Sequence, residues 1–243
     1  MKKRILIFNW KMNPASSKQA RELFFFAKKH AKLPLVIAPP FVFLKDLAVL
    51  SKKSSKLRVF SQDVSYAQKG AYTGEVSPLM LKDIGVSGSI VGHSERRILF
   101  KESDSLIREK LLAANKEKLV PVLCVGERRK TSLKKSWPIV RKQLEKDLTK
   151  TLPKNLIIAY EPVWSIGGNK ETDAAHSQKM IKSIKNYFAK TYRKRVPVLY
   201  GGSVNCGNVS SFLKYVHIDG FLAGSASLKK EEITCIIKKL INN

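Results

Sequence analysis

Short apolar runs recur along the chain, and longer amphipathic stretches separate them. The runs are continuous or nearly so, which is typical of parallel strands buried on both faces. We therefore predict strands over residues 4–9, 35–39, 57–61, 87–92, 119–125, 156–161, 197–201 and 218–223. Helical patterns lie between them, at residues 17–32, 104–118, 132–150, 172–190 and 229–241.

The helical patterns carry recognisable starts and faces. Ser16 or Ser17 is a candidate cap for the first helix, whose apolar stripe passes through Ala20, Leu23, Phe24 and Ala27. Pro138 is expected in the first turn of its helix, where a missing N–H is harmless. The third and seventh helices are expected to be short.

Eight strands that alternate with eight helical or partly helical connections predict an α/β fold, a parallel sheet closed into a (β/α)8 barrel. The 243 residues suit one such domain, residues 1–243, and no shift in composition marks a linker. An open, doubly wound sheet is the competing fold, but no GxGxxG motif follows the first strand.

The chain is strongly basic, since 46 Lys and Arg residues against 19 Asp and Glu residues give a formal net charge of +27. Such a charge is typical of proteins that bind nucleic acid or membranes. Here the cations are spread over many predicted helices, and no aromatic residues interleave them as stacking platforms. We therefore favour a lysine-rich surface that attracts anionic metabolites, and we expect neither a nucleic-acid nor a membrane partner.

Cysteine content favours a reducing, cytoplasmic setting. The three cysteines are too few and too scattered for a disulfide framework, and no Cys–His spacing suggests zinc. The apolar run at residues 5–8 is too short for a signal peptide, and no stretch approaches the ~20 apolar residues that cross a bilayer. We expect a soluble protein that is not exported.

The unusual polar residues follow the predicted strands, at the rim where (β/α)8 barrels place their chemistry. They are Asn9 and Lys11, His93 with Ser94 and Glu95, Glu161, the turn 201–203, and Gly224 with Ser225. Residues far apart in the sequence would therefore meet in one site.

Glu161 ends its strand directly before Pro162, and the apolar pair Val163–Trp164 follows. A loop that covers this carboxylate would remove its water and make it a stronger base. The stretch 166–170 carries a glycine pair, which is typical of a lid tip that closes over a ligand. The alternative is a salt-bridged strand end followed by an ordinary turn around a buried Trp.

His93 lies in VGHSERR, where Ser94 can cap a following helix and Glu95 can occupy its first turn. The positive end of that helix favours a neutral imidazole, which can donate a hydrogen bond to a carbonyl oxygen. Lys11 is a candidate fixed charge for an anionic substrate, with Trp10 and Met12 in the core. A single histidine is more often structural, and a lysine is most often a surface residue. Only the expected position of His93 and Lys11 on the same rim as Glu161 favours a catalytic role for them.

Two glycine-containing turns, YGGS at 200–203 and AGSAS at 223–227, follow the last two strands. Glycines there leave backbone N–H groups free for a phosphate, as in many barrels. Two tight turns are the alternative. The polar loop at 66–78 either binds a partner or is an unconstrained surface loop.

The segments NWKMN, GHSERR, AYEPVWSIGG, YGGSV and DGFLAGSASL together resemble the signature segments of the triosephosphate isomerase family. The similarity runs from Asn9 to Leu228, and it includes APPFVFL, QDVS, GAYTGEVSP and LCVGE. It implies a barrel that interconverts dihydroxyacetone phosphate and D-glyceraldehyde 3-phosphate through an enediolate, in glycolysis and gluconeogenesis. It also implies a homodimer that needs no metal or organic cofactor.

The resemblance also implies roles for single residues. Glu161 would match the base and His93 the neutral electrophile, while Lys11 and Asn9 would support the oxyanion and the bound substrate. Backbone N–H groups for the phosphate would come from Gly167, Ser203, Gly224 and Ser225. The supporting residues would be Ser94, Glu95, which orders the neighbourhood of Lys11, and Thr73, which enters the partner subunit through the 66–78 loop.

The chain departs from the family pattern in two places. The lid reads I-G-G-N-K over residues 166–170 where I-G-T-G-K is common, and Asn169 is the non-Gly residue type most tolerant of left-handed angles. The Ser203 hydroxyl is expected to bond the backbone N–H of residue 169. Ser225 stands where Gly is usual, which adds a hydroxyl near the phosphate and forbids angles that only Gly adopts.

Two other functions fit parts of the sequence. The fold also suits another enzyme of sugar phosphates, such as an epimerase or an aldolase. An aldolase would need a Schiff-base lysine deep in a strand, however, and no apolar strand centre carries one. A nucleic-acid-binding protein that kept the barrel without its chemistry fits the charge of +27.

Overall fold

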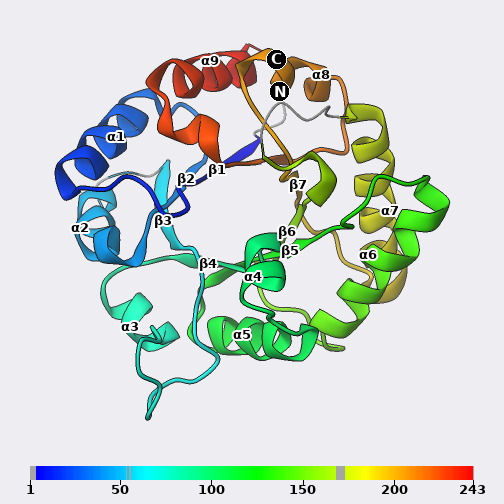
Figure 1. Ribbon diagram of the computed structural model, residues 1–243, viewed down its shortest axis with the longest axis horizontal. Helices are drawn as coiled ribbons and strands as arrows, with labels where there is room; N and C mark the ends of the chain where they lie inside the picture. Colours follow the sequence, from blue (N-terminus) through cyan, green and yellow to red (C-terminus); the bar gives the residue numbers. More distant parts are fainter. Residues whose placement is uncertain (1–3, 53, 55, 168–172, 243) are drawn as a thin grey trace.

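The computed structural model describes residues 4–52, 54, 56–167 and 173–242. Over these residues, eight parallel strands form one closed sheet in which β1 pairs with both β2 and β8. Figure 1 looks into this ring, and the helices surround it on the outside. The predicted (β/α)8 barrel is confirmed.

The observed strands lie within the predicted runs and differ from them by at most two residues at an end. They are β1 (Ile5–Asn9), β2 (Leu35–Ala38), β3 (Leu57–Ser61), β4 (Gly88–Val91), β5 (Val120–Val125), β6 (Ile157–Tyr160), β7 (Val198–Tyr200) and β8 (Gly220–Ala223).

The helices occupy the connections between the strands. They are α1 (Ser17–His30), α2 (Phe41–Ser51), α3 (Pro78–Asp83), α4 (Ser94–Leu99), α5 (Asp104–Lys116), α6 (Leu133–Asp147), α7 (Ala174–Tyr192), α8 (Cys206–Leu213) and α9 (Lys230–Ile241), with the 3-10 turns η1 (Val163–Ser165) and η2 (Ser225–Leu228). The helices after β3 and β7 are short, as predicted. Within the part of the chain described, no helix is long and apolar enough to cross a bilayer.

Strand side chains divide between two apolar layers. Residues such as Ile7, Ile90 and Val122 point inward and fill the barrel. Their neighbours, such as Leu6 and Phe8, point outward and pack against the helices. The predicted stripe of α1 is buried there, and the Ser16 hydroxyl caps that helix by accepting the Gln19 N–H. Burial on both faces is why the apolar runs are continuous.

Two expectations about single residues are wrong. Pro138 lies inside α6 rather than in its first turn. Pro138 is exposed to solvent. Water can therefore donate a hydrogen bond to the backbone carbonyl that the missing proline N–H leaves without a helical donor. Met12 is 93% exposed rather than in the core, although Trp10 is buried. Lys11 has a left-handed φ of 54°, which turns the chain outward before Met12.

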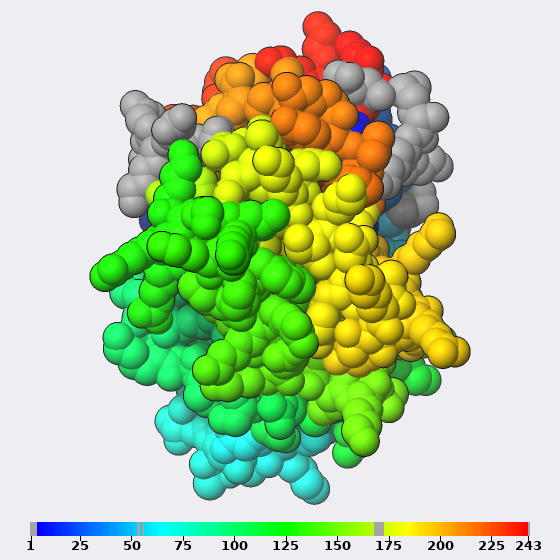
Figure 2. Space-filling model, turned by 90° about the vertical axis from the view of Figure 1, so that its right-hand side faces the viewer, coloured from blue at the N-terminus to red at the C-terminus, as the bar shows by residue number. Residues whose placement is uncertain are grey.

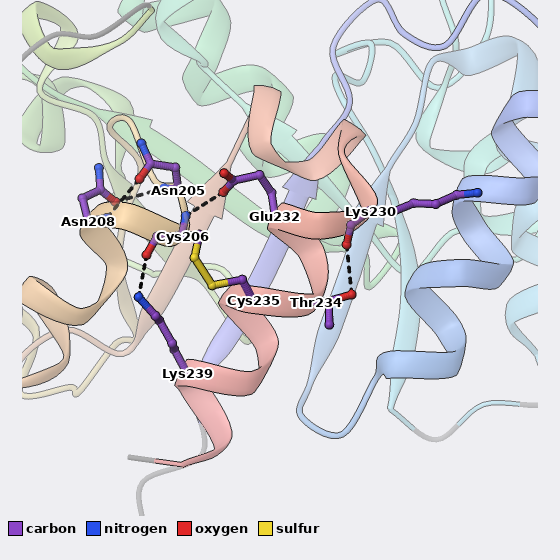
Figure 3. Close-up of a disulfide and its surroundings, with 8 residues drawn as sticks. All are labelled: Asn205, Cys206, Asn208, Lys230, Glu232, Thr234, Cys235 and Lys239. Carbon is purple, nitrogen blue, oxygen red and sulfur yellow. Dashed lines mark hydrogen bonds between the residues drawn. A yellow bond between two sulfur atoms is a disulfide. The ribbon is translucent and has the colours of Figure 1, made fainter.

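A disulfide joins Cys206, the first residue of α8, to Cys235 in α9 (Figure 3). The cysteines were expected to be too few and too scattered for a disulfide framework, yet these two pair, because α8 and α9 pack side by side and bring their Cα atoms within 5.6 Å. The Cys206 backbone is held as well: its N–H donates to Glu232 Oε2 at 2.6 Å, and its carbonyl accepts from Lys239 Nζ at 2.8 Å. The start of α8 is therefore tied to α9.

The 66–78 segment forms an irregular, exposed loop that projects from the ring between β3 and α3 (Figure 1). In the side view of Figure 2 it lies at the lower end of the molecule. The Ser65 N–H donates to the Val76 carbonyl at 2.9 Å and closes the base of the loop. Thr73 lies exposed near its tip.

We predict that the disulfide contributes measurably to stability. Replacing both Cys206 and Cys235 by Ser should lower the free energy of unfolding by about 3 to 4 kcal/mol, because the crosslink closes a long loop in the unfolded chain. Urea unfolding of the oxidised protein, the double variant and the reduced wild type measures this. The double variant and the reduced wild type should have the same free energy of unfolding. Equal stability of the oxidised protein and the double variant would contradict the prediction.

Candidate active site

The carboxyl ends of the strands surround a cavity of about 220 Å³. Its lining includes eight of the predicted site residues: Asn9, Lys11, His93, Glu161, Gly167, Ser203, Gly224 and Ser225. Ser94 and Glu95 contact three of them, Glu161, Lys11 and His93, whereas Thr73 does not line the cavity within its own chain. Ring closure therefore brings together residues from β1, β4, β6, β7 and β8.

Glu161 and His93 face each other in this cavity. Glu161 Oε1 lies 3.1 Å from His93 Nε2, and Glu161 Oε2 accepts the backbone N–H of Ser94 at 2.9 Å. The Glu161 side chain is almost completely buried, and Oε1 accepts no well-aligned hydrogen bond from the residues described. One carboxylate oxygen is thus anchored, while the other is available for a proton from a ligand.

His93 itself caps α4, because its Nδ1 accepts the backbone N–H of Glu95 at 3.3 Å. A nitrogen that accepts a hydrogen bond carries no proton, so this geometry suits a neutral ring with its proton on Nε2. That proton faces the cavity. The expectation that Ser94 caps the helix is wrong, since the helix begins at Ser94 and the cap lies one residue earlier. Glu95 occupies the first turn, as predicted.

Lys11 is held in a conformation that an L-residue rarely adopts, with φ at 54°. Its N–H donates to Asn9 Oδ1 at 3.0 Å, and its carbonyl accepts from Gln62 Nε2 at 2.7 Å. Gln62 also donates to the Ala38 carbonyl at 2.9 Å, which ties the loop to β2. The Lys11 ammonium pairs with Glu95 Oε1. These contacts fix a positive charge at the cavity edge.

Gln62 was not predicted as a site residue. It follows β3 directly, so its position at a strand end was a usable signal. Its role depends on two carbonyls from other loops, and no sequence pattern reveals those contacts.

Two glycines make room for the functional side chains. A Cβ at residue 201 would lie 3.0 Å from Glu161 Cγ, and one at residue 224 would lie 3.2 Å from Lys11 Cε. Both distances are tighter than ordinary van der Waals contact. Ser225 begins the 3-10 turn η2. Among the described residues, it is not one of those with a positive φ, so the backbone angles at this position are ones that serine can adopt.

Glu127 fixes the segment that follows Glu161, and it too was not predicted as a site residue. Its carboxylate accepts from Tyr160 Oη at 2.9 Å and from Trp164 Nε1 at 2.8 Å. Its carbonyl accepts the Val163 N–H at 3.0 Å. Burial, followed by the Glu127 charge, raises the pKa of Tyr160, so this hydroxyl stays a donor. The signal was a carboxylate two residues after the end of β5, close to the kind of position that identified Glu161.

The predicted lid lies mostly outside the described residues. Ile166 and Gly167 are described and line the cavity, and Gly167 has a left-handed φ of 81°. Gly168, Asn169 and Lys170 lie outside, as does the expected bond from Ser203 to the residue 169 N–H. Those expectations stay predictions.

Arg97 holds the β4–α4 turn in place behind His93. Its guanidinium donates to the Gly92 carbonyl at 2.8 Å, the Cys124 carbonyl at 3.0 Å and Asp147 Oδ2 at 2.6 Å. Burial raises the pKa of Asp147 to about 7, against the opposing effect of Arg97. Burial, and then the Glu161 charge, raises the pKa of the Cys124 thiol, so Cys124 remains protonated beneath the site.

A buried charge cluster supports the other side of α4. Lys110 Nζ donates to both oxygens of Asp63, at 2.9 and 2.8 Å, and to Glu102 Oε1 at 2.5 Å. Arg96 bonds the same two carboxylates. Lys110 was predicted only as part of the α5 pattern, yet it is 3% exposed. The cluster links β3, α4 and α5 beneath the site.

The arrangement suits proton transfer on a small anion. It offers a carboxylate with a free oxygen, an imidazole donor, a fixed ammonium and backbone N–H groups at the glycine turns. No group of three or more His, Cys, Asp or Glu residues in the described part of the chain could hold a metal ion. The fold and the cavity define a (β/α)8-barrel enzyme with an acid–base site.

Comparison with known proteins narrows this class to one family. Residues 4–240 match the family model described as triosephosphate isomerase. The chain is 41% identical to the triosephosphate isomerase of Buchnera aphidicola subsp. Schizaphis graminum, over 98% of each chain. It is 39% identical to that of Caldanaerobacter subterraneus subsp. tengcongensis, over 98% of this chain and 99% of the relative. The chain belongs to the triosephosphate isomerase family.

We predict that Gln62 positions Lys11 for anion binding. Gln62→Ala should weaken binding of 2-phosphoglycolate, a small phosphate-bearing anion, by about ten- to a hundredfold, because a misplaced charge loses most of its effect. Isothermal titration calorimetry measures this, with the exposed Gln19→Ala as the matched control. Unchanged affinity in Gln62→Ala would show that Lys11 holds its conformation without this bond.

Proposed function

We propose that this protein interconverts dihydroxyacetone phosphate and D-glyceraldehyde 3-phosphate, as a step of glycolysis and gluconeogenesis. Membership of the triosephosphate isomerase family supports this substrate pair. The single observation that carries the chemistry is the distance of 3.1 Å between Glu161 Oε1 and His93 Nε2 within one cavity. An acid–base pair at that separation can act on adjacent carbon and oxygen atoms of one small substrate.

Glu161 is the proposed base. Its free oxygen takes a proton from C1 of dihydroxyacetone phosphate, while His93 Nε2–H donates a hydrogen bond to the C2 carbonyl oxygen. The electron pair of the broken C–H bond forms the enediolate double bond, and negative charge develops on oxygen. The C1 hydroxyl proton passes to the C2 oxygen, with His93 Nε2 as the relay, and Glu161 returns its own proton to C2, which gives the aldose.

Lys11 and Asn9 are proposed to stabilise the developing negative charge. The ammonium of Lys11 is held by Glu95, and the Asn9 amide is held by the Lys11 N–H, so neither group has to reorganise during the reaction. Ser94 keeps the other Glu161 oxygen in place through its backbone N–H.

The phosphate is proposed to bind at the glycine turns. Gly167, Ser203, Gly224 and Ser225 line the cavity, and their backbone N–H groups are the proposed donors to the phosphate oxygens. Closure of the segment 166–170 would exclude water and keep the enediolate from losing phosphate. The turn η1, which precedes this segment, is held by the Glu127 contacts to Val163 and Trp164.

The aldolase alternative is the weaker one. Lys11 is the lysine that lines the described cavity, and its ammonium is paired with Glu95. A paired, charged lysine is a poor Schiff-base nucleophile. Borohydride treatment with substrate should therefore leave the protein unmodified.

We propose that the protein is a homodimer and that the 66–78 loop enters the partner subunit. Tyr66 and Tyr72 are each 43% exposed, and their rings pack edge to face with centroids 5.5 Å apart. Met12 is 93% exposed beside the active site. Exposure of these apolar side chains to water is unfavourable, and burial against a second subunit would remove it.

A cytoplasmic location is also proposed, because the substrates are metabolites of central carbon metabolism. The Cys206–Cys235 disulfide runs against this setting, since disulfides are rare where thiols are kept reduced. Alkylation of free thiols in intact cells, followed by mass spectrometry, would report the state of these two cysteines in place.

We predict that Glu161→Gln lowers kcat by about 10²–10⁴-fold while the protein stays folded, because the amide cannot accept the proton. A coupled assay in both directions measures turnover, and circular dichroism checks the fold. The exposed Glu22→Gln on α1 is the matched control and should keep full activity. Wild-type turnover in Glu161→Gln would remove this residue from the proposed mechanism.

We predict that Thr73→Arg disrupts the dimer, because a long cation cannot enter a close-packed pocket near Lys11 of the other subunit. Sedimentation velocity should show one dimeric species for wild type and a monomer for the variant. Thr191→Arg, at an exposed position on α7, should remain dimeric. A wild type that sediments as a monomer would contradict the proposed assembly.

A further inference from the structure

The end of the barrel where the strands begin, here called the amino-terminal pole, carries two adjoining cavities. One has a volume of about 570 Å³ and lies between the segments that precede β6 and β7. The other, of about 420 Å³, lies against the starts of β1, β2 and β3. Both are lined by Arg58, Val120 and Ile157, so they lie side by side. Each volume is within the range of about 300–1,000 Å³ typical of small-molecule sites.

The charged groups that line these cavities are all positive. The larger cavity has Arg58, Lys154, Lys194 and Arg195, and the smaller adds Lys32 and Lys56. Neither lining contains an Asp or Glu. None of these six side chains forms an ion pair with a residue in the described ranges.

Another basic cavity differs from these two because its lining also contains acidic residues. A cavity of about 530 Å³ beside α5 and α6 contains Arg97 and Lys146, but also Asp104. Asp104 lies 2.9 Å from Arg97 and 3.5 Å from Lys146. Asp104 therefore pairs with two of the four cations in that lining, whereas none of the six cations at the amino-terminal pole has an acidic partner in the described ranges.

The two cavities differ in the rest of their lining. The larger has four cations and Asn155, together with apolar residues such as Pro153 and Val196. The smaller has an apolar wall that includes Leu33, Val36 and Phe60. A ligand that fills both needs several negative charges at one end and a flat, weakly polar group at the other.

We propose that the amino-terminal pole binds a nucleoside triphosphate. The phosphates lie among Arg58, Lys154, Lys194 and Arg195, and the base lies against the apolar wall of the smaller cavity. Guanidinium and ammonium groups from three separate segments suit a flexible chain of phosphates, because each phosphate can meet its own donor. Concave cavities favour a small ligand over a nucleic-acid duplex or a bilayer, which would need an open surface.

This site is separate from the catalytic cavity, since the two lie at opposite ends of the strands. Neither lining contains Asn9, Lys11, His93 or Glu161. Ligand binding at the pole and isomerase turnover can therefore be measured independently, and failure of one proposal leaves the other standing.

The test is calorimetric titration with ATP while 2-phosphoglycolate saturates the catalytic cavity. ATP should bind at one site per chain, and affinity should fall as ionic strength rises. Tripolyphosphate should bind more weakly, and adenosine more weakly still, because each fills only part of the site. Absence of ATP binding under these conditions would overturn the proposal.

Matched charge variants locate the site. Lys154→Gln combined with Lys194→Gln and Arg195→Gln should weaken ATP binding at least about tenfold, because three charge-assisted contacts are lost. Lys134→Gln with Lys135→Gln and Lys142→Gln removes the same charge from exposed positions of α6 and should leave ATP binding within about twofold of wild type. Turnover should be unchanged in both.

Two results would contradict the assignment. Equal loss of affinity in both triple variants would mean that ATP responds only to the overall positive field. Displacement of ATP by a single-stranded RNA homopolymer that binds more tightly would mean that the pole serves nucleic acid instead.

Discussion

Closure of the sheet, by pairing of β1 with β8, is the constraint on which the rest of the structure depends. All eight strands of the described chain run parallel, so closure places every carboxyl end on one rim. Glu161 after β6 and His93 after β4 come within 3.1 Å for this reason alone, although 68 positions separate them in sequence. The same closure gathers the strand starts, and with them a separate group of cations, at the opposite end.

The fold and much of the site follow from local features of the sequence. Strands buried on both faces leave continuous apolar runs, and polar residues such as Asn9 and Glu161 mark where each run ends. Gln62 and Glu127 sit at equivalent positions, but their importance depends on bonds to other loops. The Cys206–Cys235 pair and the outward turn at Met12 depend likewise on how α8 packs on α9 and on the left-handed Lys11, which no local pattern encodes.

The site is stabilised mainly by groups that do not touch a substrate. Gln62 holds Lys11 in a costly backbone conformation, and the backbone of Ser94 holds one oxygen of Glu161. Arg97 and the Lys110 cluster fix α4 from beneath. Preorganised groups of this kind favour a transition state because they need not move when charge develops. At the amino-terminal pole the charges lack such partners within the described chain, which is why an external anion fits there.

The most direct test of the central claim is a crystal structure of the protein with 2-phosphoglycolate bound. The carboxylate of this mimic should lie within about 2.6–3.2 Å of both Glu161 and His93 Nε2. Its phosphate should accept backbone N–H groups from the turns that contain Ser203 and Gly224. A mimic bound elsewhere, or one that contacts only one of the two side chains, would contradict the account.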